Sequence, residues 1–234
     1  MKAKSYIYLG LIILITILLV VLNNILNEVV LFENTSLQIN KQVSYQSITL
    51  LIAISLLLFL RIFKKKEFLI YFKKGNVSAK INPEPIVGIK PKAHENWSHV
   101  GENLATVITL VTAIVIYFQV IKDNQIELTT LLKYLPFSIL FALNNSFVEE
   151  IITRFGVVVS LKNVLPDNYI SIISGLIFGT VHFWGNPGGV IGLLFAGFLG
   201  WFLAKSILET KGIYWAWLIH FLQDVVIITA LLSI

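Results

Sequence analysis

The sequence contains no cysteine and few charged residues, and each shortage excludes a class of protein. Without cysteine, the 234-residue chain forms no disulfides and uses no thiol chemistry. Charged residues make up 13% of the chain, whereas about a quarter is usual for a soluble domain. Hydrophobic residues make up 56%, so the expected solvent is lipid. The length allows one compact bundle without a large soluble domain.

The apolar stretches of the chain are close to the length that a membrane-spanning helix needs, about 20 residues. They cover residues 6–22, 48–63, 104–120, 131–159, 169–183, 190–208 and 213–232. The first is interpreted as a retained helix and not a signal peptide, because it ends in Asn23-Asn24 without a small-residue cleavage site. The fourth is long, and Asn144-Asn145 is a candidate point of division. The expected fold is all-α, a polytopic membrane helix bundle with about seven transmembrane helices.

Lysine and arginine gather at the end of the second expected span and in the segment that follows it. These residues are Arg61, Lys64, Lys65, Lys66, Lys73, Lys74, Lys80, Lys90 and Lys92. By the positive-inside rule, this run predicts a cytoplasmic loop. Nucleic acid is not an expected partner, because no aromatic-interleaved basic fold accompanies the run. Alternation then places the N-terminus and the loops at Lys162 and Lys211 in the cytoplasm, and the loops at Glu28 and 185–189 outside, in a multi-pass protein of the cell membrane.

Small residues recur at four-residue spacing in the sixth expected span. They are Gly188, Gly192, Ala196 and Gly200. In a bilayer such a stripe lets another helix approach closely. The pattern therefore predicts a helix contact and no chemistry.

Ionisable side chains deep in the expected spans are few, and they gather in the last four spans. They are Glu149, Glu150 and Arg154 in the fourth span, His182 in the fifth, and His220 and Asp224 in the seventh. Charges inside a bilayer are costly and usually mark function. Counted inward at about 1.5 Å per residue, residues of three spans lie roughly 10–20 Å from the cytoplasmic ends. We therefore expect them to share one site.

Helical spacing pairs Glu150 with Arg154 and His220 with Asp224, because residues four apart share a face. Each feature also has a structural interpretation. The Glu150–Arg154 ion pair can serve the fold alone, and a single membrane histidine is often a hydrogen-bonded packing residue. Phe178, one turn before His182, is interpreted mainly as packing. A common depth for the whole set is harder to explain by packing.

Hydrolysis without a nucleophilic side chain needs an activated water, a general base and a group that stabilises the oxyanion. A buried glutamate beside a histidine supplies the first two, and a second histidine donates to the oxyanion or binds a metal. The zinc-protease motif H-E-x-x-H is absent. Glu149, His182 and His220 still offer ligands for a divalent metal such as zinc. The sequence leaves metal-activated and glutamate-activated water open.

Three short motifs in order resemble those of a known family. They are Glu149-Glu150-x-x-x-Arg154, Phe178-x-x-x-His182 and His220-x-x-x-Asp224. This set resembles the CAAX-protease and bacteriocin-processing (Abi) family of intramembrane metalloproteases, which includes type II CAAX prenyl endopeptidases. The resemblance runs from about residue 131 to the C-terminus. It implies a cavity open to the cytoplasm. The chain is expected to consist of a two-helix region with the basic segment, 1–102, and an intramembrane protease core, 103–234.

The resemblance also implies roles for the site residues. Glu149 would be the general base, and His182 would help to activate the water. Glu150 and Arg154 would support the site, while His220 and the residue four positions later would hold the oxyanion. That later residue is often asparagine in the family and is Asp224 here. Because an ionised aspartate donates no hydrogen bond, Asp224 is either protonated, an orienting partner of His220 or a metal ligand.

The leading hypothesis is an intramembrane endopeptidase whose partners are the lipid bilayer and a membrane-proximal peptide or protein substrate. A non-catalytic bacteriocin-immunity or scaffold protein on the same fold is the alternative. A proton-coupled transporter is a third, because buried Glu and His relays occur in transporters. Transporters of that kind usually carry inverted repeats with broken helices, and the sequence has none.

Overall fold

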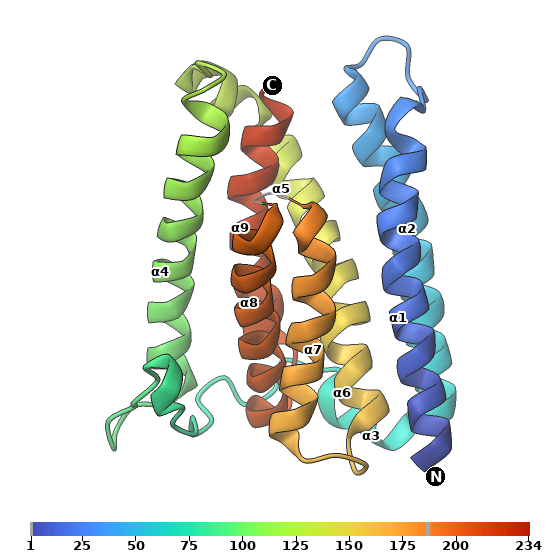
Figure 1. The fold of residues 1–234 in the computed structure, drawn as a ribbon, viewed down its shortest axis with the longest axis vertical. Helices are drawn as coiled ribbons and strands as arrows, with labels where there is room; N and C mark the ends of the chain where they lie inside the picture. The colour runs from blue at the N-terminus through green and yellow to red at the C-terminus, as the bar shows by residue number, and fades with distance from the viewer. Residues whose placement is uncertain (1, 186–187) are drawn as a thin grey trace.

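The computed structural model describes residues 2–185 and 188–234, which are helical apart from loops and one isolated bridge between Glu84 and Ile89. The longer helices are α1 (Lys2–Ile25), α2 (Leu37–Phe63), α4 (Trp97–Ile116), α5 (Leu128–Glu150), α7 (Asp167–Val181), α8 (Gly189–Thr210) and α9 (Tyr214–Leu232). Shorter helices are α3 (Lys65–Tyr71) and α6 (Gly156–Leu161). The expected all-α bundle is confirmed (Figure 1).

Six helical stretches in the described residues are long and apolar enough to cross a membrane. Among the longer helices, the one outside this set is α7, which has 15 residues and spans only about 22 Å at 1.5 Å per residue. The hydrocarbon core is about 30 Å thick, so α7 is a partial span within the bundle. The connection from α7 to α8 includes Asn186 and Pro187, which lie outside the described residues.

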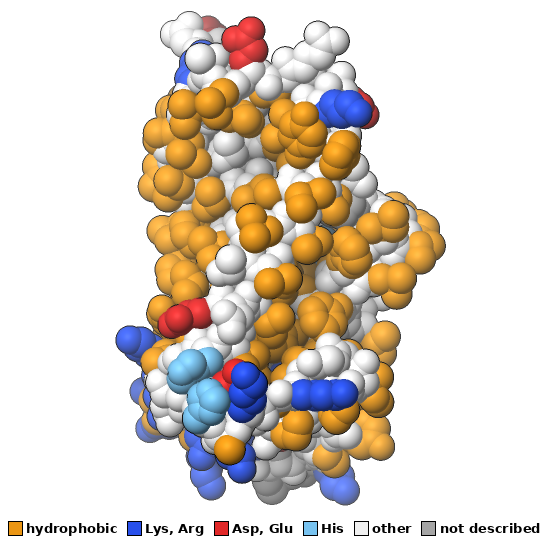
Figure 2. Space-filling view, turned by 90° about the vertical axis from the view of Figure 1, so that its left-hand side faces the viewer, with side chains coloured by type: hydrophobic (Ala, Val, Ile, Leu, Met, Phe, Trp, Pro, Cys, Tyr) orange, Lys and Arg blue, Asp and Glu red, His pale blue; other side chains and the backbone are white. Residues whose placement is uncertain are grey.

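The two ends of the bundle differ in charge. We call the end with the N-terminus, α3 and the loops 72–96, 162–166 and 211–213 the basic end, because most lysines and arginines lie there (Figure 1). Lys41, Lys122 and Lys133 lie toward the opposite end, where α1 ends and α5 begins. Figure 2 shows hydrophobic side chains over the middle of one face and mostly basic side chains at its lower end. This banding fits a membrane protein whose two ends lie in water.

The centre of the bundle is the continuation of α5. Asn144-Asn145 do not divide this helix, which runs unbroken to Glu150. Instead the helix widens into one π turn, Ile151–Phe155, and continues as α6. All residues from Ile151 to Leu161 are buried. They pack against α1, α2, α7 and α8, so the helix with the acidic pair is held on all sides.

Glycines let α7 and α8 pack closely. A Cβ atom on Gly175 would lie 2.7 Å from the carbonyl oxygen of Gly197, and one on Gly200 would lie 3.1 Å from the Cα of Gly175. These contacts confirm the predicted close approach through Gly200. They also add Gly197, which lies outside the predicted stripe, and glycines of α7 as the matching surface.

The close contact predicts a stability difference between two glycine-to-alanine variants. In Gly179→Ala the new Cβ would lie 2.7 Å from the carbonyl oxygen of Leu193, so the helices must separate. We expect a loss of about 1–3 kcal/mol, typical of overpacking, measured by thermal unfolding in detergent. Gly10→Ala in α1 is the control, because its Cβ would meet no described atom within 4 Å. Equal unfolding temperatures for the two variants would contradict the packing argument.

Candidate active site

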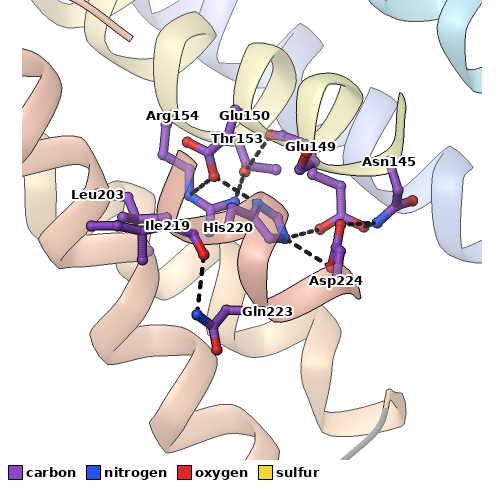
Figure 3. A network of polar contacts seen from close by, with 12 residues as sticks. Asn145, Glu149, Glu150, Thr153, Arg154, Leu203, Ile219, His220, Gln223 and Asp224 are labelled. Atoms are coloured by element: carbon purple, nitrogen blue, oxygen red, sulfur yellow. Dashed lines mark hydrogen bonds and ion pairs between the residues drawn. The ribbon is translucent and has the colours of Figure 1, made fainter. Parts of the chain in front are cut away.

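The structure brings the predicted polar residues of α5 and α9 together at mid-depth. Glu149 and Glu150 are the last residues of α5, and Arg154 lies in the π turn that follows. His220 and Asp224 face them from α9 (Figure 3). Single π turns in helices often occur at functional sites. Here the π turn sets the direction of Arg154 relative to the two glutamates.

Glu150 is the buried anchor of the cluster. Its Oε1 lies 3.2 Å from Arg154 Nε and 2.8 Å from His220 Nδ1. Arg154 is 0% and Glu150 1% exposed, so the carboxylate is shielded from solvent and paired on two sides. The Arg154 guanidinium also lies over the Phe178 ring, 3.4 Å from its centroid, and donates to Thr153 Oγ1 at 2.6 Å. These contacts join α5, α7 and α9.

His220 lies between three carboxylates. Its Nδ1 faces Glu150, and its Nε2 lies 3.5 Å from both Glu149 Oε2 and Asp224 Oδ1. A histidine donates from both ring nitrogens only as an imidazolium. The surroundings of His220 therefore favour the protonated ring, with Nε2–H directed at the boundary between Glu149 and Asp224.

Asn145 is a site residue that the sequence analysis missed. Its Nδ2 donates to Glu149 Oε1 at 3.1 Å and to Asp224 Oδ2 at 3.1 Å. The amide therefore holds two carboxylates of different helices side by side (Figure 3). The available signal was its spacing, since Asn145 lies four residues before Glu149 on the same helical face.

His182 occupies the end of α7, and its tautomer follows from one contact. Its Nδ1 lies 2.8 Å from the carbonyl oxygen of Phe178. Because a carbonyl only accepts hydrogen bonds, Nδ1 carries the proton, and in the neutral ring Nε2 keeps its lone pair. The Phe178 ring packs 4.0 Å from the His182 ring and 5.5 Å from the His220 ring, centroid to centroid. Phe178 therefore forms a wall of the site as well as packing.

Two cavities meet at these residues. The larger, about 650 Å³, is lined by Glu149, His182 and Asp224 together with residues of α1 and α2. The smaller, about 250 Å³, is mostly apolar, lies between α4, α8 and α9, and is also lined by His182, His220 and Asp224. Glu149 and His182 thus face one cavity. In the part of the chain that the structure describes, Glu149 Oε2 is buried and has no hydrogen-bond partner.

The larger cavity extends away from the basic end. Its lining includes Asn23 and Asn24 at the end of α1 and Leu231 near the end of α9. The sequence analysis placed both the basic segment and the cavity mouth on the cytoplasmic side. The structure places them at opposite ends of the bundle, so the two expectations cannot both hold.

The candidate metal ligands do not form a preformed metal-binding site. Among residues 2–185 and 188–234, no group of three or more His, Asp or Glu side chains is arranged to hold a metal ion. Both Nδ1 atoms are engaged, His182 with a backbone carbonyl and His220 with Glu150, so only Nε2 of each ring could bind a metal. As they are placed, Glu149, His182 and His220 do not form a metal site.

A comparison with protein families supports the resemblance. Residues 131–226 match the model of a family described as type II CAAX prenyl endopeptidase Rce1-like, a family of CAAX-type proteases. The matched segment contains all the candidate site residues, and residues 1–130 lie outside it. The predicted resemblance to type II CAAX prenyl endopeptidases is confirmed over this segment. No curated protein and no solved structure matched the chain.

The buried cluster predicts unequal costs for two lysine or arginine substitutions. Arg154→Met leaves the Glu150 carboxylate buried with one partner fewer, and we expect a loss of about 3–5 kcal/mol. Lys162→Met removes a partly exposed pair with Asp167, for which about 0–1 kcal/mol is expected. Thermal unfolding in detergent measures both. Equal losses would mean that the Glu150–Arg154 pair does not hold the helices together.

Proposed function

We propose that the protein is an intramembrane endopeptidase that hydrolyses peptide bonds with a water activated by Glu149 and His182. The observation that carries the proposal is that Glu149 and His182 line one cavity inside the bundle. The match of residues 131–226 to a CAAX-type protease family supports the same reaction class. The substrate is a membrane-proximal peptide or protein segment.

Activation of the water is assigned to the two groups with free acceptor atoms. Glu149 Oε2 accepts no hydrogen bond from the described residues, although it lies 3.5 Å from His220 Nε2. In the neutral ring of His182, Nε2 keeps its lone pair because Nδ1 donates to Phe178. Both atoms accept a hydrogen bond from the same water, which orients its oxygen toward the scissile carbonyl. Glu149 takes the proton as the carbon–oxygen bond forms.

His220 is assigned to the oxyanion. Its Nε2–H lies beside Glu149, the assigned base, where it can donate to the oxyanion as it forms. Donors that are already in place when charge develops are worth several kcal/mol in a water-poor site. Glu150 and Arg154 support His220 from the side of Nδ1, so they are positioning residues.

Asp224 is assigned to orientation and not to donation. It accepts from Asn145 and lies 3.5 Å from His220 Nε2, contacts that suit an ionised carboxylate.

Collapse of the tetrahedral intermediate breaks the carbon–nitrogen bond, and Glu149 returns its proton to the leaving amine. The products are a carboxylic acid and an amine, as hydrolysis requires.

Isosteric amide variants test this mechanism. Glu149→Gln removes the base and His182→Gln removes the imidazole lone pair, so each should lower cleavage of a membrane-anchored peptide by about 10²–10⁴-fold. Glu102→Gln is the control, because Glu102 is exposed on α4 outside the site. Its cleavage rate should equal that of the unchanged protein.

The outcomes separate the competing functions. Full cleavage by the Glu149 and His182 variants would refute the assigned roles. A cellular phenotype that survives both substitutions, without cleavage by any variant, would favour a bacteriocin-immunity or scaffold protein. Uptake into vesicles that depends on a pH gradient would favour a proton-coupled transporter.

A chelator distinguishes the glutamate mechanism from a metal mechanism. A divalent metal such as zinc is the alternative activator, with Glu149, His182 and His220 as its candidate ligands. On the mechanism proposed above, cleavage continues after dialysis against a chelator, and elemental analysis of the purified protein finds no stoichiometric metal. If chelation abolished cleavage and added zinc restored it, the activator of water would be a metal and not Glu149.

A further inference from the structure

We infer that substrates reach the site from the extracytoplasmic side of the membrane, through the larger cavity. This inference rests on the proposed peptidase function, because a substrate presupposes catalysis. The direction of the cavity does not depend on cleavage. It combines two observations, the direction of the larger cavity and the distribution of lysine and arginine.

Polar side chains line the larger cavity, among apolar ones, along its path from the site to the end opposite the basic end. Asn145 lies at the site, Gln42 and Tyr45 line the cavity from α2, and Asn23 and Asn24 line it at the end of α1. Asn23 and Asn24 are exposed. Amide and hydroxyl groups are costly in hydrocarbon unless they meet water or a partner. Their alignment along one cavity therefore marks a water-filled path from that end.

The other direction is closed by packed side chains. Between the site and the basic end lie the buried residues Ile151–Leu161 of the π turn and α6. Trp97, Phe202 and Leu203 are also 0% exposed. No residue of the loops 72–96, 162–166 or 211–213 is among the described residues that line either cavity. A peptide at the basic end would meet the hydrophobic core and not the site.

The charges assign the two ends to the two sides of the membrane. The basic end contains Lys64 and the lysines of α3, and the loops at Lys162 and Lys211. These segments are short or lie close to membrane-spanning helices. Such loops stay in the cytoplasm. The opposite end contains Glu28, Glu33 and few lysines. The cavity mouth therefore faces the extracytoplasmic side.

This placement narrows the class of substrate. The scissile bond must lie in a segment that is available on the extracytoplasmic side, such as the extracytoplasmic flank of a membrane protein or a peptide that has been exported. The polar lining suits an extended backbone, whose N–H and C=O groups need partners. Segments that are available only in the cytoplasm are excluded as substrates.

Single-cysteine labelling tests the inference directly, because the natural chain has no cysteine. Asn24→Cys marks the cavity mouth and Lys65→Cys marks the basic end, and both positions are exposed. With a membrane-impermeant maleimide on intact cells, we expect Asn24→Cys to be labelled. Lys65→Cys should be labelled only after the membrane is permeabilised. Asn23→Cys and Lys66→Cys are second variants for each end.

A matched pair on α1 tests whether water reaches the cavity. Val20 lines the larger cavity, whereas Leu18, at nearly the same depth and about 200° around the helix, is 42% exposed on the outer surface. Thiol reagents react with the thiolate form of cysteine, which does not form in lipid. A charged thiosulfonate added outside should therefore modify Val20→Cys at least about tenfold faster than Leu18→Cys.

Two results would overturn the inference. Labelling of Lys65→Cys but not Asn24→Cys on intact cells would show that the mouth faces the cytoplasm. Equal modification of Val20→Cys and Leu18→Cys would show that the cavity does not admit water. Neither readout requires catalysis, so an inactive protein with the expected labelling would refute the peptidase proposal and leave the orientation standing.

Discussion

The structure depends on one buried carboxylate. Glu150 lies inside the bundle with Arg154 on one side and His220 on the other, and an unpaired charge at this depth would cost several kcal/mol. The two partners come from a π turn and from α9, and Arg154 also stacks on Phe178 of α7. The contacts around this single carboxylate therefore fix the positions of three helices relative to one another.

That arrangement separates the neighbouring glutamates into two roles. Glu150 uses its contacts for the fold, and Glu149, one residue earlier and about 100° around the helix, faces the larger cavity with one oxygen that accepts no hydrogen bond from the described residues. Asn145 holds Glu149 and Asp224 side by side. The reactive groups are thus held by a support that does not itself need to react.

The bundle is also asymmetric along the membrane normal. Polar side chains of α1, α2 and α5 line a path to one end, while the residues of the π turn and α6 fill the other with packed apolar side chains. The short helix α7 ends at the level of the site, which places His182 at the end of the helix and not within it. A site at mid-depth can therefore be open on one side only.

Much of this protein was readable from local pattern. Hydrophobic runs located the helices, and the cost of charge in lipid singled out Glu149, Glu150, Arg154, His182, His220 and Asp224, because both signals depend only on residue type and helical spacing. Tertiary structure decided which glutamate faces the cavity, that Asn145 joins Glu149 to Asp224, that α7 is too short to span, and toward which end the cavity opens. These features depend on how each helix is rotated and how deep it sits against its neighbours. Packing among distant segments sets both the rotation and the depth of a helix, and neither can be deduced from the periodicity of a single helix.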